Sequence, residues 1–164
     1  MPMTLKGSCR CGAIAFSVAS HTPQPYQLCY CTICRKTDGG GGFAINIMGD
    51  ANTLEITGRR SLRVYRARVV DERGRCVTSS GRRHFCPKCS SALWMYDPEW
   101  PDLVHPFASA IDTELPMPSS KVHCMLRFKA SWVKPDIGPR DQKFALYPKL
   151  SIEQWHKRRG LWID

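Results

Sequence analysis

Seven of the nine cysteines lie in three short clusters, and they are the residues in this sequence best suited to chemistry. Cys29, Cys31 and Cys34 stand close together, while Cys9-Arg10-Cys11 and Cys86-Pro87-Lys88-Cys89 form two separate pairs. Thiolates at such spacings typically hold zinc, with zinc–sulfur bonds of about 2.3 Å. A single C-x-x-C pair would also fit a redox site, but three clusters in one short chain favour metal binding.

The clusters divide into four sulfurs and three. The two pairs together supply the four ligands of a closed site, which is the usual form of a structural zinc. The triplet leaves one corner of a tetrahedron open, as catalytic zinc sites do. The alternative for the triplet is a second structural zinc, completed by a histidine or by Cys76 or Cys124. Because these two cysteines match no ligand spacing, they are otherwise expected to be small buried side chains.

The composition fits one zinc-binding domain spanning residues 1–164 in the cytoplasm. The chain is 43% hydrophobic and 23% charged, as ordinary globular domains are. Its first residues contain no apolar core typical of a signal peptide, and no apolar run approaches the length of a membrane span. Clustered cysteines in such a chain indicate a metal protein rather than a disulfide framework.

The formal net charge is +10, and much of it comes from one arginine-rich stretch. Nine arginines lie between Arg59 and Arg83, against only Asp71 and Glu72. Such a face could hold a polyanion or steer a small acidic substrate. A solvated strand-and-turn surface explains the same composition equally well.

Apolar residues alternate with polar ones through most of the chain, which predicts half-buried strands and a mainly β fold. The last segment differs, because Ser151 and Gln154 form a capping box at the start of a short C-terminal helix. Trp155 of this helix is expected to pack on the sheet and His156 to lie on the surface. The alternating segments centre on Ile14–Val18, Phe43–Ile47, Leu54–Ile56, Leu62–Val64, Leu93–Met95, Val104–Ile111 and Val122–Phe128.

Four glycines, residues 39–42, follow the triplet directly. Glycine permits positive φ and close approach of the backbone to a ligand. The sequence does not distinguish this role from that of a flexible hairpin loop.

Three motifs resemble the glutathione-dependent formaldehyde-activating enzymes, a family that also includes centromere protein V. They are Gly7-Ser8-Cys9-Arg10-Cys11-Gly12, Cys29-Tyr30-Cys31-Thr32-Ile33-Cys34-Arg35-Lys36 and Arg83-His84-Phe85-Cys86-Pro87-Lys88-Cys89. The resemblance implies a small fold of coiled β-sheets, related to a Rab-GTPase chaperone and the B-type methionine sulfoxide reductases. Two departures stand out: Tyr30 and Ser90 occupy positions where many members have histidine and glycine.

The resemblance also implies which sulfurs hold which ion. It places a structural zinc on Cys9, Cys11, Cys86 and Cys89, and a second, catalytic and more labile zinc on Cys29, Cys31 and Cys34. This is the same division that the spacing favours. His84, His105 and His123 could flank the open site, although packed strand residues are the ordinary role of such histidines.

A zinc ion with three thiolates favours a substrate thiol as its fourth ligand, held as an activated nucleophile. The predicted function is therefore that of a carbon–sulfur lyase, similar to S-(hydroxymethyl)glutathione synthase, which adds glutathione or a similar thiol to formaldehyde or another small aldehyde. Arg35, Lys36 and Asn46 are the candidate substrate contacts, with Arg83 as a further cationic candidate. No membrane partner is expected, and a homo-oligomer is compatible with the sequence.

The alternative is a zinc-stabilised binding module without enzymatic activity. In that case the arginine-rich face would bind nucleic acid or another acidic partner. The sequence contains no recognised nucleic-acid motif, so nucleic acid is the less favoured partner.

Overall fold

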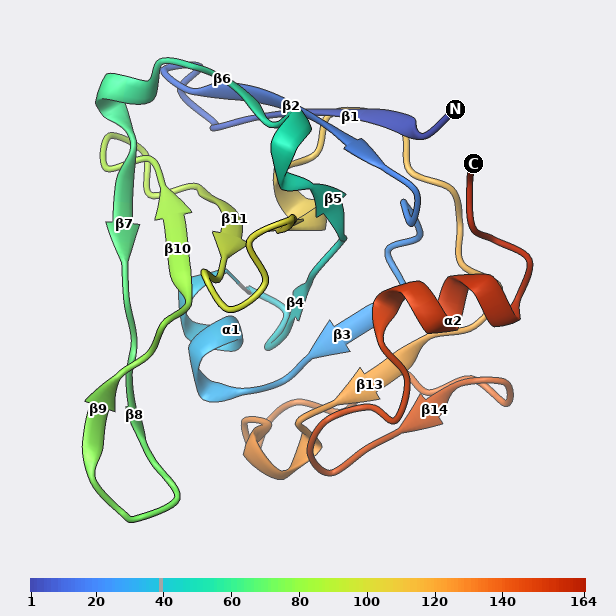
Figure 1. Cartoon of the computed structure of the whole chain (residues 1–164). Coiled ribbons are helices and arrows are strands. Elements are labelled where there is room, and N and C mark those ends of the chain that lie inside the picture. Colours follow the sequence, from blue (N-terminus) through green and yellow to red (C-terminus); the bar gives the residue numbers. More distant parts are fainter. Residues whose placement is uncertain (39) are drawn as a thin grey trace.

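Strands dominate the structure, as the sequence predicts, and the described residues form four sheets and two short α-helices (Figure 1). The structure is a computed structural model that describes residues 1–38 and 40–164. The helices are α1 (Thr32–Thr37) and α2 (Ile152–Arg158). In chain order, the strands are β1 (Met3–Ser8), β2 (Ala15–Ser20), β3 (Gln27–Cys29), β4 (Ala44–Ile45), β5 (Gly49–Asp50), β6 (Glu55–Thr57), β7 (Arg63–Tyr65), β8 (Arg68–Val70), β9 (Cys76–Thr78), β10 (Arg82–Phe85), β11 (Ala92–Tyr96), β12 (Leu103–Pro106), β13 (Val122–Cys124) and β14 (Gln142–Lys143).

Two antiparallel sheets enclose the largest apolar core. One has the strand order β1-β2-β6, and the other has the order β5-β12-β11-β10-β7. Phe16 of the first sheet packs edge-on against Trp94 of the second, with 5.0 Å between the ring centroids. Ile14, Leu93 and Val104 are fully buried in the same cluster. The turn between β1 and β2 and the turn between β10 and β11 carry the two cysteine pairs.

A third sheet, ordered β14-β13-β3-β4, carries the cysteine triplet. β13 runs parallel to both β3 and β14, and β3 pairs antiparallel with β4. Cys29 is the last residue of β3, and the chain turns from there into α1. The triplet therefore lies where a strand passes into a helix.

Strands β8 and β9 form a hairpin of their own. Figure 1 shows this hairpin extending beyond β7 and β10, away from the other sheets. Its side chains are mostly exposed, and Val70 retains 71% of its accessible surface. The arginine-rich stretch thus belongs largely to this two-stranded projection and the strands that lead to it.

Helix α2 begins at the predicted capping box. The Ser151 hydroxyl accepts a hydrogen bond from the Gln154 amide, and the Gln154 side chain accepts one from Ser151. Trp155 is buried and stacks on Tyr26, with ring centroids 3.6 Å apart. The prediction of a surface His156 is wrong: this side chain is fully buried because it faces Tyr26 and its Nδ1 bonds the Ile152 carbonyl.

Two predicted strands are shorter than their apolar patterns indicate. The strand expected over Val104–Ile111 ends at Pro106, which has no amide to donate to a ladder, and Ala108–Ala110 form a 3-10 turn. The strand expected over Val122–Phe128 ends at Cys124, because Met125 has a left-handed backbone with φ 57°. The apolar residues beyond these points still pack, but they do so from turns.

Of the glycine run, Gly39 lies outside the described residues. Gly42 has φ 86°, and a Cβ placed there would lie 2.4 Å from the Cγ2 atom of Val133. Positive φ and close approach are thus both present at this position, where a larger residue would clash. Within residues 1–38 and 40–164, no helix has the length and apolar character needed to cross a membrane.

Candidate metal centres

The structure brings together the four sulfurs of the two cysteine pairs. The Sγ atoms of Cys9, Cys11, Cys86 and Cys89 all lie within 4.8 Å of one another. Cys11 Sγ is 3.6 Å from that of Cys9 and 3.7 Å from that of Cys86. Because one pair comes from the three-stranded sheet and the other from the five-stranded sheet, a metal ion held here would join the two sheets.

The three sulfurs of the triplet also converge. The Sγ atoms of Cys29, Cys31 and Cys34 lie within 4.8 Å of one another. Cys31 is the N-cap of α1, and its sulfur accepts the Cys34 amide at 3.3 Å. Contacts with the Cys29 and Cys34 thiols, together with this amide, lower the pKa of the Cys31 thiol to about 2. Of the three thiols, Cys31 therefore favours the thiolate, the form in which cysteine binds metal, whereas contact with Cys124 raises the pKa of Cys29 and contact with Cys29 raises the pKa of Cys34.

Neither of the two remaining cysteines joins this group. Cys124 is buried in β13 directly beside Cys29, and their residues are register partners. Its thiol contacts that of Cys29, but among the described residues the triplet group whose sulfurs all lie within 4.8 Å of one another does not include Cys124. Cys76 is exposed on the hairpin and accepts a hydrogen bond from Arg68, so the expectation that it would be buried is wrong.

Arg83 is the cationic residue that reaches the triplet. One guanidinium nitrogen, Nη2, donates to Cys34 Sγ at 3.5 Å, and the group lies over the Phe107 ring at 5.8 Å from its centroid. The other nitrogen, Nη1, is buried and has no partner among the described residues. A buried donor without a partner is costly, so this nitrogen is suited to an anionic ligand.

The other predicted substrate contacts are placed differently. Arg35 is half-buried on α1, Lys36 is exposed beside it, and Asn46 forms an isolated bridge with Phe107. None of the three is among the described residues that line the two pockets next to α1. Their role in substrate binding stays a prediction.

Two adjoining pockets border α1, and the smaller of them is also lined by Arg83. The smaller one, of about 230 Å³, is lined by Arg83, His84 and Phe107, and we call it the narrow pocket. The larger one, of about 430 Å³, extends toward the Cys9 turn and is called the wide pocket. Both are lined by Thr37, Ser90 and Ala92, so they adjoin each other, and we call the two together the depression.

Three residues of the wide pocket are not among the site residues predicted from the sequence. They are Asp38 at the end of α1, Ser109 in the turn after β12, and Asp112 just beyond that turn. Only Asp38 could have been anticipated, because it stands four residues after Cys34 and so shares its face of the helix. The other two come from a distant segment that the fold brings to the cysteine turns.

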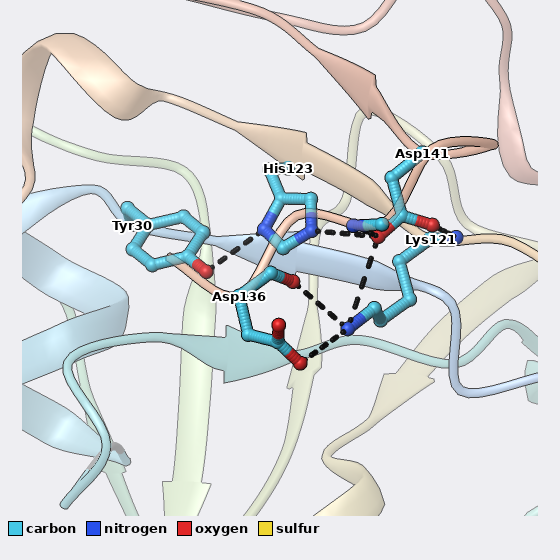
Figure 2. Close-up of polar contacts among 6 residues, drawn as sticks. Tyr30, Lys121, His123, Asp136 and Asp141 are labelled. Atoms are coloured by element: carbon cyan, nitrogen blue, oxygen red, sulfur yellow. Dashed lines mark hydrogen bonds and ion pairs between the residues drawn. The ribbon is translucent and has the colours of Figure 1, made fainter. Parts of the chain in front are cut away.

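The histidines do not complete the triplet group. Figure 2 shows His123 between Tyr30 and Asp141. The Tyr30 hydroxyl lies 2.9 Å from His123 Nδ1, and His123 Nε2 lies 3.4 Å from an Asp141 oxygen. His84 stacks on Trp94, and His105 is a half-buried residue of β12. Tyr30, one of the two departures from the family pattern, thus fixes the strand that carries the triplet.

The chain belongs to the glutathione-dependent formaldehyde-activating enzyme family, whose profile matches residues 4–125. The resemblance found in the motifs is thereby confirmed. A relative from Halomonas elongata, named "Putative glutathione-dependent formaldehyde-activating enzyme", is 53% identical over 159 residues, which cover 97% of this chain and 98% of the relative. A crystal structure of a Rhodobacter sphaeroides protein is 20% identical with a TM-score of 0.49, covering 69% of this chain and 99% of that protein.

Proposed function

We propose that this protein is a zinc-dependent carbon–sulfur lyase that adds a glutathione-like thiol to formaldehyde or another small aldehyde. The observation that supports this most directly is the difference between the two sulfur clusters. One cluster offers four sulfurs, whereas the other offers three and has a cationic side chain beside it. The name of the relative from Halomonas elongata points to the same reaction. Residues 1–164 are a single cytoplasmic domain in this proposal.

The first ion is a structural zinc on Cys9, Cys11, Cys86 and Cys89. Sulfur separations of 3.6 and 3.7 Å support this assignment. Four sulfurs placed about 2.3 Å from a central zinc ion would lie roughly 3.8 Å apart at the corners of a tetrahedron. The all-sulfur donor set also favours zinc over harder metals.

The second ion is a catalytic zinc on Cys29, Cys31 and Cys34. When bound, it would hold a substrate thiol as a thiolate at neutral pH. Arg83 places a positive charge at Cys34, where it offsets the negative charge of the gathered sulfurs. The cluster is half-buried and packs against Phe107 and Ala92, so these residues exclude water from one side.

The reaction conserves all atoms of its two substrates. The thiol sulfur forms a bond to the aldehyde carbon, and the carbon–oxygen double bond becomes a single bond. The proton lost by the thiol ends on the new hydroxyl group, which gives a hemithioacetal. The reverse reaction cleaves the carbon–sulfur bond, as the lyase class requires.

Cobalt substitution tests whether a thiol reaches the triplet. Tetrahedral cobalt–thiolate centres absorb strongly, so glutathione should change the spectrum of the cobalt protein. S-methylglutathione, whose sulfur is blocked, should change it much less. The variant Cys34→Ala should lose the response and stay folded, because the four-cysteine cluster is intact.

A spectrum indifferent to every thiol would overturn this proposal. The triplet would then be structural, and the non-enzymatic binding module would become the leading function. The exposed arginine-rich hairpin of β8 and β9 is the feature that favours this second candidate. Its partner would be nucleic acid or another polyanion.

A further inference from the structure

Tyr30 lies between two cysteines of the triplet in sequence, and its side chain packs on the opposite face of the chain from theirs. Side chains alternate between two faces along extended backbone. Tyr30 accordingly packs with Leu28 and Val133 in one apolar cluster, whereas Cys29 and Cys31 pack in another. A shift of the Tyr30 ring would therefore be transmitted through the backbone to the thiols on both sides of it.

The Tyr30 hydroxyl is held by a buried histidine. Tyr30 and His123 retain only 1% and 0% of their accessible surface, and 2.9 Å separates the hydroxyl oxygen from His123 Nδ1. Burial lowers the pKa of His123, which favours the uncharged ring at pH 7. An uncharged imidazole that accepts the hydroxyl proton at Nδ1 carries its own proton on Nε2, which it can donate.

Asp141 accepts from His123 and is itself fixed by backbone amides. His123 Nε2 lies 3.4 Å from Asp141 Oδ2. The same carboxylate accepts the Lys121 amide at 2.7 Å and the Gly138 amide at 2.8 Å. Figure 2 shows the resulting chain of contacts from Tyr30 through His123 to Asp141. The tyrosine hydroxyl and both ring nitrogens are thus paired, and the chain of contacts ends on a carboxylate that the backbone holds in place.

This network lies where the pairing of β3 with β13 ends. The last register partners of the two strands are Cys29 and Cys124, and the Tyr30 amide donates to the Cys124 carbonyl at 3.0 Å. Beyond this point the chain turns into α1, whose N-cap is Cys31. The side chain of Tyr30 therefore ties the chain to β13 at the position where the backbone ladder stops and the triplet begins.

We propose that Tyr30 is a positioning residue for a metal ion at the triplet: its bond to His123 holds the Cys29 and Cys31 thiols in the arrangement that binds the ion. Residues that orient metal ligands in this way act on affinity without touching the metal. The inference rests on one part of the proposed function, the assignment of an ion to the triplet, and does not require that a thiol or an aldehyde reaches that ion. It predicts that loss of one hydroxyl group weakens one metal site and leaves the other unchanged.

Competition with a chromophoric chelator measures the affinities of the two ions in the zinc-loaded protein. The release step that disappears in Cys34→Ala belongs to the triplet. Tyr30→Phe keeps the ring and removes the hydroxyl, so it should weaken the triplet ion about tenfold, as loss of an orienting partner typically does. The ion of the four-cysteine cluster should be released as it is from the unaltered protein. With cobalt at the triplet, the same variant should shift the absorption bands, because these report the arrangement of the sulfurs.

Tyr26→Phe is the matched control. Tyr26 directly precedes β3 and is as buried as Tyr30, and its hydroxyl lies 3.4 Å from Gln27 Oε1. Its ring stacks on Trp155 of α2, in an apolar cluster that contains no cysteine of the triplet. This variant should leave both affinities and the cobalt spectrum unchanged. A loss of folding stability that the two variants share is thereby separated from an effect on the triplet.

Variants of His123 test whether the hydroxyl acts through the ring. His123→Leu removes the acceptor, so it should weaken the triplet ion as Tyr30→Phe does, and the double variant should be little worse than either single one. His123→Asn places an amide oxygen near the position of Nδ1 and should restore part of the affinity that His123→Leu loses.

Three results would overturn the inference. They are equal weakening of both ions by Tyr30→Phe, an unchanged triplet affinity and spectrum in that variant, and additive losses in the double variant. If Tyr30→Phe weakens the triplet ion selectively while no thiol changes the cobalt spectrum, the positioning role stands and the proposed chemistry fails.

Discussion

Ser90 shows how a single residue couples the four-cysteine cluster to the depression beside it. Its backbone is left-handed, with φ 62°, directly after Cys89, and its amide donates to the Cys86 carbonyl at 2.7 Å. Its side chain lines both the wide and the narrow pocket. A residue with a Cβ in this conformation is strained, and strain of this kind is often retained at functional sites.

Replacing Ser90 with glycine should relieve this backbone strain and stabilise the folded protein. Ser90→Gly should raise the free energy of unfolding by roughly 0.5–1 kcal/mol, because glycine adopts positive φ without steric cost. Urea unfolding of the zinc-loaded protein measures the change, and Ser90→Ala is the control that keeps the strain and removes the hydroxyl. A glycine variant no more stable than the alanine variant would argue against stored strain.

At the residue scale, the cysteine clusters are predictable from sequence because their ligand spacing is local. Cys9 and Cys11 are fixed by one turn, and so are Cys86 and Cys89. Asp112 is different, since it reaches the pocket only through the packing of the segment after β12 against the β1–β2 turn. No spacing along the chain encodes that approach.

Among the elements, helix α2 carries a buried titratable group. His156 Nδ1 lies 2.8 Å from the Ile152 carbonyl, and Nε2 is buried with no partner in the described part of the chain. Burial lowers the pKa of His156, and the nearby charge of Arg159 acts in the same direction. Protonation of Nε2 would place an unsatisfied charged donor in the apolar cluster around Trp155.

This arrangement predicts a loss of stability in acid. The folded-state pKa lies below the unfolded value of about 6.5, so the unfolded chain binds more protons below that pH. The stability that neutral His156 contributes is therefore present above pH 6.5 and is lost as the pH falls through the folded-state pKa. His156→Asn should be less stable than the unaltered protein at pH 8, and the difference should narrow at pH 5.

Ile152→Val is the control for this experiment, because it opens a small cavity in the same helix without removing a titratable group. Its deficit in urea unfolding should stay the same at both pH values. A His156→Asn deficit that is also constant would show that the histidine is not the acid-sensitive group.

The elements that the sequence predicts best are those defined by residues close together in the chain. The capping box at Ser151 is defined by two residues three positions apart and appears as predicted. Helix α1 is not predicted from the sequence, because it has only six residues, only two residues separate it from β3, and one of its few apolar side chains is a candidate ligand. Strand ends at Pro106 and Met125 depend on how the following turn packs, which periodicity alone does not reveal.

At the scale of the whole molecule, the two sulfur clusters have different mechanical roles. The four-cysteine cluster joins the β1–β2 turn to the β10–β11 turn, which lie far apart in sequence and in different sheets. The triplet joins only the end of β3 to the first turn of α1. Loss of the four-cysteine cluster should separate the two sheets. Loss of the triplet should destabilise only the junction between β3 and α1.

Matched cysteine-to-serine variants should reveal this difference. Structural zinc contributes on the order of 10 kcal/mol of apparent binding energy, which is comparable to the stability of a whole domain. Cys86→Ser should therefore yield insoluble or unfolded protein. Cys31→Ser should stay folded, because serine is itself a good N-cap for α1, and should lose about one of two metal equivalents, the triplet ion being the more labile. Thermal melts and elemental analysis measure both outcomes. If the two variants melt alike, or if soluble, folded protein contains no zinc, the division into a structural and a catalytic site is wrong.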